Sequence, residues 1–156
     1  MKTIMKPWTY CLAAAGLLCL SAGLFAAGAA QAFDLALAKK LAAKAGEHAV
    51  KNGWKISIAV VNSEGNLVYF ERADGAFPGS IEAAIEKAKS ANAYRRPTKV
   101  FSDSVKQGNT GIVTLKNVVA VEGGLPIVLE GLHAGAIGIS GARAAEDEAC
   151  AQAALN

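Results

Sequence analysis

The last third of the chain contains three short apolar segments separated by very short turns. The segments are residues 118–121, 126–130 and 136–140, and their composition favours β-strands. Only residues 122–124 and 131–134 lie between them. A parallel crossover needs a dozen or more residues, so connections of this length allow only antiparallel neighbours. The spacing therefore predicts that these three strands lie side by side in one antiparallel sheet.

Two more strands are predicted upstream. Residues 56–61 alternate between larger and smaller side chains, residues 63–66 have the composition of a turn, and residues 67–70 return as a second apolar run. This pattern is typical of a β-hairpin. Together with the first three segments it predicts a sheet of five strands.

The remaining segments show the periodicity of helices. Asp34 is a good N-cap for a helix that Asn52-Gly53 ends, and Ser80 is expected to cap a second helix that stops before Pro97. A short helix is expected over residues 98–106 and an alanine-rich one over residues 144–155. The expected fold is a single α+β domain, with a five-stranded, mainly antiparallel sheet and helices packed on it.

Residues 1–32 have the composition of an export signal. Lys2 and Lys6 precede an apolar run over residues 11–27, and Ala30-Gln31-Ala32 supplies the small residues of a cleavage site. We predict a signal peptide cleaved between Ala32 and Phe33, a mature domain of residues 33–156, and a periplasmic or secreted protein. The alternative is a membrane anchor, for which the apolar run is slightly short and rich in glycine.

The charge of the chain is nearly balanced. The formal net charge is +3, and removal of Lys2 and Lys6 leaves 14 basic against 13 acidic residues. A balance this close to neutral argues against nucleic acid as a partner. After cleavage of the signal, no membrane attachment is expected.

The two histidines are far apart and do not form a zinc motif. His48 falls on a predicted helix and His133 in a predicted turn, without the close spacing to other ligands that a closed metal site requires. The metal ligand is therefore left open. Either histidine could still donate one axial bond to a haem iron, since haem needs only one or two protein ligands.

Basic residues gather around the second predicted helix. They include Arg72, Lys87 and Arg95. Cations in such a cluster could hold the carboxylates of a ligand, such as haem propionates or a small organic acid. The alternative is a solvated helix face with local ion pairs.

A series of segments, taken together, carries a family resemblance. They are residues 57–62, Gly65-Asn66-Leu67, residues 72–76, 86–91, 95–98, 122–126, 135–141 and Asp147-Glu148. Their order and spacing resemble the GlcG/HbpS-like family, often called the haem-degrading domain, which also forms the C-terminal part of PduO-type proteins. The likeness covers about residues 34–155. Many members carry an aspartate where this chain has Asn62.

The resemblance implies a layered, profilin-like α+β architecture and a homo-oligomer. In secreted members it implies haem binding, in some cases with haem breakdown or with redox sensing beside a sensor protein. It also implies a threonine ligand to the haem, at the position of Thr98 here. An alternative role for Thr98 is to cap the short helix that follows. Cytoplasmic GlcG-like members are associated with glycolate metabolism.

These observations lead to one functional hypothesis with an alternative. The chain is expected to be an exported haem-binding protein whose porphyrin lies against the second helix and the neighbouring sheet. Thr98 or His133 would bind the iron, Arg72, Lys87 and Arg95 would hold the propionates, and haem degradation would be a further activity. The alternative is a non-haem accessory module that binds a small organic acid or a partner protein.

Overall fold

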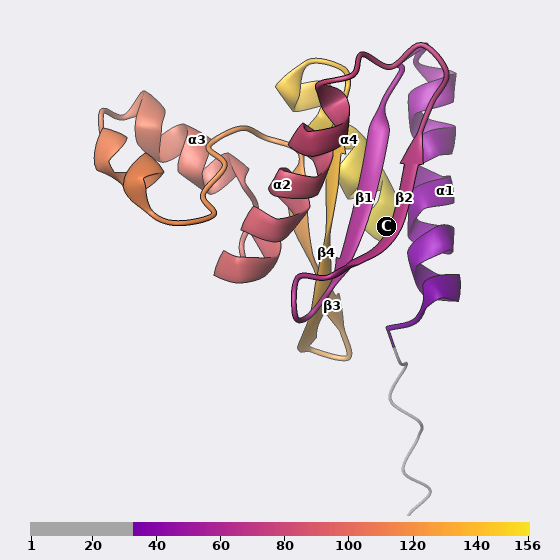
Figure 1. Cartoon of the computed structure of the whole chain (residues 1–156), viewed down its shortest axis with the longest axis horizontal. Helices are drawn as coiled ribbons and strands as arrows, with labels where there is room; N and C mark the ends of the chain where they lie inside the picture. Colours follow the sequence, from indigo (N-terminus) through magenta and orange to yellow (C-terminus); the bar gives the residue numbers. More distant parts are fainter. Residues whose placement is uncertain (1–32) are drawn as a thin grey trace, which may run out of the picture.

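A four-stranded antiparallel sheet organises the described part of the chain, with helices on both faces (Figure 1). In this computed structural model residues 33–156 are described, and the predicted signal peptide lies outside them. The elements in chain order are α1 (Leu35–Lys51), β1 (Ser57–Asn62), β2 (Leu67–Arg72), α2 (Ser80–Tyr94), α3 (Lys99–Lys106), the 3-10 helix η1 (Thr110–Thr114), β3 (Gly124–Leu129), β4 (Leu132–Ser140) and α4 (Ala144–Leu155). Within residues 33–156, no helix has both the length and the apolarity to cross a bilayer.

The strand order across the sheet is β2-β1-β4-β3. Each neighbouring pair is antiparallel, as the short connections require. Strand β1 is central and pairs with β4 from Ser57 opposite Ser140 to Asn62 opposite Gly135. The β1–β2 turn and the start of β4 therefore lie at the same end of the sheet.

The prediction of a fifth strand over residues 118–121 is wrong. The N–H of Val118 donates to the carbonyl of Leu115 in a turn, and the N–H of Val119 donates to the Ser90 hydroxyl at 3.0 Å. Because these groups bond to a turn and to α2, this apolar segment runs beside the helix and does not extend the sheet.

Helices α1 and α4 cover one face of the sheet, and α2 covers the other (Figure 1). The α2 interface is made of small residues: Ala84, Ala88 and Ala91 pack on the sheet with no exposed surface. A Cβ at Gly138 of β4 would overlap the carbonyl oxygen of Ala84. The inner face of α2 is therefore closed by the chain's own residues.

The β3–β4 hairpin is tighter than the sequence predicted. Glu130 and Gly131 alone make the turn, with φ values of 50° and 80°. Positive φ at both central residues is typical of a type I′ turn, whose twist matches that of the flanking strands. As a result His133 lies within β4, whereas a turn position was expected.

One predicted helix cap is confirmed and one is not. The Asp34 carboxylate accepts from the N–H of Leu37 at 2.8 Å, as expected. Gly79, rather than Ser80, occupies the cap position of α2. The Ser80 hydroxyl instead donates to the carbonyl of Phe77 at 2.6 Å and lies 2.8 Å from the Ser57 hydroxyl, which ties the start of α2 to β1.

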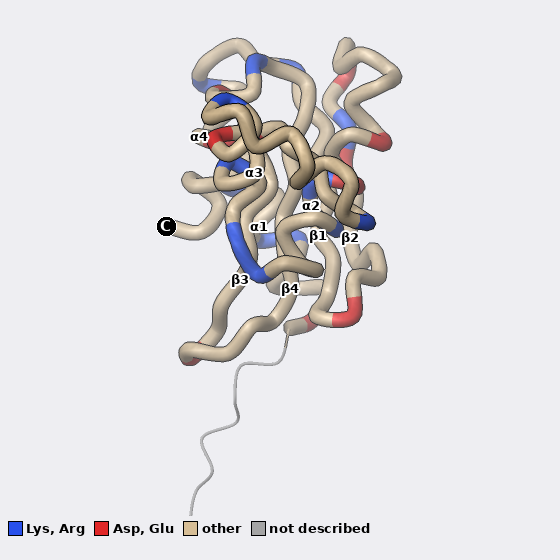
Figure 2. The backbone as a smooth tube through the Cα atoms, turned by 90° about the vertical axis from the view of Figure 1, so that its left-hand side faces the viewer, with Lys and Arg blue, Asp and Glu red and all other residues tan. Residues whose placement is uncertain are grey.

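Helix α3 and η1 project from the sheet and helix layers (Figure 1). The segment is anchored by Phe101, which is buried and stacks edge-on against Tyr94 at 5.2 Å. Lys99 and Lys106 reach one carboxylate oxygen of Glu122 at 3.2 and 3.0 Å. Acidic and basic residues occur along the whole described chain, this segment included (Figure 2).

Candidate functional site

A polar cleft lies where the C-terminal half of α2 meets the β1–β2 turn and the start of β4. Its volume is about 730 Å³. It is lined by Ser63, Glu64, Gly65, Glu86, Lys89, Asn92, Ala93, Arg95, Lys116, Asn117 and His133. We call it the His133 cleft. Two of the five residues that the sequence singled out, His133 and Arg95, come together here.

The sheet register and the projecting segment bring these walls together. Antiparallel pairing of β1 with β4 places the 63–66 turn beside the strand that carries His133. Helix α2 runs across the same end of the sheet and brings Asn92 over the turn. On the other side, the Tyr94 hydroxyl donates to the carbonyl of Lys116 at 2.6 Å and holds that loop against α2.

His133 is half-buried and held from one side only. Its Nε2 lies 2.8 Å from Oδ1 of Asn92. Its Nδ1 is buried and has no hydrogen-bond partner among the described residues. Burial, and then the neighbouring positive charge of Arg95, lower the pKa of His133 from its usual value of 6.5. At neutral pH the ring is therefore uncharged and keeps a lone pair for a metal or a proton donor.

Three cations line the cleft together with His133, beside the carboxylates of Glu64 and Glu86. Lys89 pairs with Glu86 at 2.8 Å, whereas Arg95 and Lys116 form no salt bridge within the described residues. Arg95 is exposed and caps α2 in a left-handed conformation, with φ of 50°. A carboxylate entering the cleft would therefore meet two unpaired cations.

The other predicted site residues lie elsewhere in the fold. The Lys87 ammonium is buried and contacts Asp147 and the carbonyl of Ile139, each at 2.8 Å. Burial raises the pKa of Asp147, and Lys87 opposes this shift. Lys87 is therefore engaged inside the protein rather than presented to a ligand.

Thr98 is fully buried at the joint between α2 and α3. Its hydroxyl accepts from the N–H of Gly124 at 2.9 Å, and its own N–H donates to the carbonyl of Gly124 at 2.9 Å. Although Thr98 is at the cap position of α3, its side chain makes no capping bond. Its hydroxyl joins this corner to the start of β3.

Arg72 lies at the opposite end of the sheet from the cleft. It pairs with Ser57 at the start of β1, and its guanidinium donates to the carbonyl of Ala76. This contact closes the loop that follows β2. The structure therefore does not bring Arg72, Lys87 and Thr98 to the His133 cleft.

Sequence reasoning missed Asn92, which contacts both the turn and the histidine. A signal was present: Ala84, Ala88 and Asn92 are spaced by four residues along α2, so a polar residue continues the buried alanine stripe. A buried amide at such a position needs partners, because an unpaired polar group in the interior is unfavourable.

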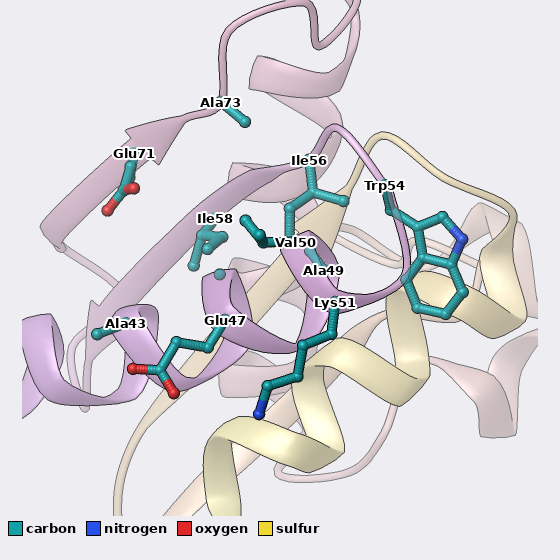
Figure 3. A pocket seen from close by; sticks show the side chains of 11 residues that line it. Ala43, Glu47, Ala49, Val50, Lys51, Trp54, Ile56, Ile58, Glu71 and Ala73 are labelled. Carbon is teal, nitrogen blue, oxygen red and sulfur yellow. The ribbon is translucent and has the colours of Figure 1, made fainter.

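A second cavity is an apolar groove between α1 and the β1–β2 edge of the sheet (Figure 3). Its volume is about 470 Å³, and its lining includes Val50, Trp54, Ile56 and Ile58. Its charged side chains are Glu47, Lys51 and Glu71, two acids and one base. The ring of His48 packs near Trp54, with the ring centres 5.9 Å apart. This groove has the apolar walls that the His133 cleft lacks, but its lining carries one cation, Lys51, against two acids.

Among residues 33–156, no group of three or more histidine, cysteine or acidic side chains is placed to hold a metal ion. A ligand that needs a single protein nitrogen is a different case, because His133 alone can supply it.

Comparison with known proteins decides the family. Residues 33–156 match the family described as "Haem degrading protein HbpS-like". The chain belongs to the HbpS-like family. It is 38% identical to protein GlcG of Escherichia coli K12 over 104 residues, which are 67% of this chain and 78% of GlcG.

Solved structures of HbpS-like proteins share the fold. A crystal structure of HbpS superposes with a TM-score of 0.72 at 34% identity, covering 79% of this chain and 87% of that one. A crystal structure of a PduOC:heme complex superposes with a TM-score of 0.73 at 28% identity, covering 80% and 93%. These likenesses confirm the predicted family and the α+β class, with four strands in place of five.

Proposed function

We propose that this chain is an exported haem-binding protein and that haem binds at the His133 cleft. The observation that carries the proposal is the state of His133. Burial and Arg95 lower its pKa, and its Nδ1 has no hydrogen-bond partner among the described residues. Arg95 and Lys116, which form no salt bridge within residues 33–156, line the same cleft. A haem needs one or two axial ligands and cations for its propionates. The heme complex of the structurally similar PduOC supports haem as the ligand.

The residues of one chain would supply an iron ligand and cations for the haem propionates. The apolar surface that haem also needs would come from a second copy of the chain. His133 would bind the iron, and Arg95, with Lys89 and Lys116, would hold the propionates. Haem, when bound, would supply an iron centre capable of redox chemistry. The cleft offers little apolar wall of its own, but exposed Leu115 directly precedes Lys116, one of its lining residues. We propose that a second copy of the chain covers this side, which makes the protein a homo-oligomer.

A haemin titration followed by the Soret band tests the iron ligand. We expect saturation at a defined stoichiometry and at least about tenfold weaker binding in His133→Ala, which corresponds to about 1.4 kcal/mol. His48→Ala is the matched variant at the other histidine and should bind normally. If His48→Ala loses binding instead, haem binds beside α1. A broad spectrum that never saturates contradicts haem binding altogether.

Substitutions at two neighbouring arginines test whether Arg95 of the His133 cleft holds a haem propionate. Arg95→Gln should weaken haemin binding, and more so at low salt, where charge pairing is least screened. Arg96→Gln is the control, since Arg96 is exposed and donates to the carbonyl of Tyr94, outside the cleft lining. Equal effects of the two substitutions would argue against a specific propionate contact.

Haem degradation is tested on the same complex. Addition of ascorbate should bleach the Soret band and release iron if the protein degrades haem. A stable spectrum under these conditions assigns the protein to haem sequestration or sensing.

The polarity of the cleft favours one alternative, the binding of a small organic acid. The cations of the cleft could also hold a compact carboxylate, which needs no apolar wall. Calorimetry with glycolate and related acids discriminates the two. Saturable heat that Arg95→Gln abolishes, in a protein that does not bind haemin, would support the alternative.

A further inference from the structure

We infer that Asn92 is a positioning residue that holds His133 in one tautomer, with the proton on Nε2 and the free lone pair on Nδ1. For the neutral ring, the tautomer follows from the hydrogen bonds of Asn92. Its consequence for a ligand rests on the proposed function, because it identifies which nitrogen of His133 would bind iron.

Hydrogen bonds within the β1–β2 turn hold its backbone in place. The N–H of Asn62 donates to the carbonyl of Asn66 at 3.0 Å, and the N–H of Asn66 donates back to the Asn62 side chain at 2.9 Å. Gly65 closes the turn at a φ of 84°, a conformation that favours glycine. The carbonyl of Ser63 is therefore held at a fixed place.

The carbonyl of Ser63 fixes the orientation of the Asn92 amide. One end of this amide lies 3.1 Å from the carbonyl oxygen of Ser63. A carbonyl oxygen only accepts, so the amide must turn its NH₂ group toward Ser63. Its oxygen then faces His133, at 2.8 Å from Nε2.

The Asn92 oxygen in turn fixes which nitrogen of the His133 ring carries the proton. The Asn92 oxygen has no proton to give, so Nε2 of His133 must be the donor in the contact between them. A neutral ring carries one proton, which leaves Nδ1 bare. Nδ1 indeed has no partner among the described residues. Because the Ser63 carbonyl can only accept, it sets the direction of both hydrogen bonds, from Asn92 to Ser63 and from His133 to Asn92.

The ligating nitrogen follows from the tautomer. Metal-binding histidines usually donate their other N–H to a protein oxygen, which orients the ring and raises its basicity. Asn92 supplies such an oxygen to Nε2, so iron would bind at Nδ1. Because Nδ1 is shielded from solvent in this structure, a ligand reaches it only after neighbouring side chains move apart.

Nitrogen NMR of the ¹⁵N-labelled protein without haem reads the tautomer directly, at a pH where His133 is uncharged. We expect a protonated, pyrrole-type signal for Nε2 and a bare, pyridine-type signal for Nδ1. The reverse pattern, or a mixture of both tautomers, overturns the inference. This measurement needs no substitution, so it decides the question even if an Asn92 variant does not fold.

A pair of matched substitutions tests the role of Asn92. Asn92→Leu has similar size and removes the acceptor, so His133 should relax to a mixture of tautomers. Asn109→Leu makes the same change in an exposed loop outside the cleft and should leave the signals unchanged. An unaltered His133 tautomer in folded Asn92→Leu overturns the inference.

A haemin titration of the same variants separates this inference from the proposed function. Asn92→Leu should weaken haemin binding by about 10- to 100-fold, as loss of an orienting partner does at other metal sites. If the Nε2–H tautomer is found but haemin does not bind to the unaltered protein, only the haem proposal fails. If haemin binds through His133 equally well in both variants, the positioning role of Asn92 is contradicted.

Discussion

At the scale of single residues, the polar groups of the interior have definite partners. The buried pair of Lys87 and Asp147 joins α2 to the start of α4, and Lys87 also holds the end of β4 through Ile139. A buried ion pair adds less stability than its distance suggests, because both charges lose their hydration. Removal of one partner is more harmful, because it leaves the other charge buried alone.

Lys87→Met tests this asymmetry. The substitution should lower the free energy of unfolding by about 3–5 kcal/mol, since Asp147 is left buried without its cation. Urea denaturation measures the loss. The double variant Lys87→Met with Asp147→Leu should recover part of it. A loss below about 1 kcal/mol, the range of exposed pairs, would contradict the burial described here.

His133 should make stability depend on pH. Its folded pKa lies below the usual value of 6.5, so the unfolded chain binds this proton more tightly. The contribution of the neutral ring is therefore fully present above pH 6.5 and is lost as the pH falls through the folded pKa. Denaturation at pH 7.5 and 5.5 should show a smaller pH dependence in His133→Gln than in the unaltered protein. An unchanged dependence would show that His133 does not contribute.

At the scale of helices and strands, local patterns predicted most elements and tertiary contacts decided the exceptions. Alternation and turn composition were enough to predict the hairpin of β1 and β2, and the Asp34 cap was confirmed. Residues 118–121 have the composition of a strand, but their N–H groups bond to Ser90 and Leu115. Ser90 is 29 residues from its partner Val119, so this contact leaves no trace in a short sequence window.

The site was only partly predictable for the same reason. His133 and Arg95 share a cleft because β4 pairs with β1 beneath the end of α2, which depends on the strand order. Lys87 and Thr98 were plausible ligand residues by type. Their partners, Asp147 and Gly124, are 60 and 26 residues away in the chain, so their engagement could not be inferred from spacing.

The packing of α2 on the sheet depends on the absence of a side chain at Gly138. Gly138→Ala should destabilise the protein by about 3 kcal/mol or more, because the added carbon meets the α2 backbone rather than a flexible side chain. Gly46→Ala is the matched control within α1, where the nearest atom to the new Cβ is 3.9 Å away. That change should stabilise by up to about 1 kcal/mol. Thermal unfolding should show a lower Tm for Gly138→Ala and a higher Tm for Gly46→Ala. Shifts of Tm in the same direction would contradict this packing.

At the scale of the whole molecule, export is a proposal that rests on residues 1–32 alone. Expression in a bacterial host followed by fractionation should give a periplasmic or secreted protein. N-terminal sequencing of that fraction should begin at Phe33. A full-length chain that stays in the membrane fraction would support the anchor alternative instead.

The projecting α3 and η1 segment leads into one wall of the His133 cleft, through Lys116 and Asn117, while α3 packs mainly against η1. Elements with few partners outside themselves open more readily than the sheet does. Amide hydrogens in this segment should therefore exchange with solvent sooner than those of β1 and β4. A molecule that bridges Lys116 and Arg95 would fasten the segment to α2. Amide hydrogens along α3, some distance from the bound molecule, would then exchange with solvent more slowly.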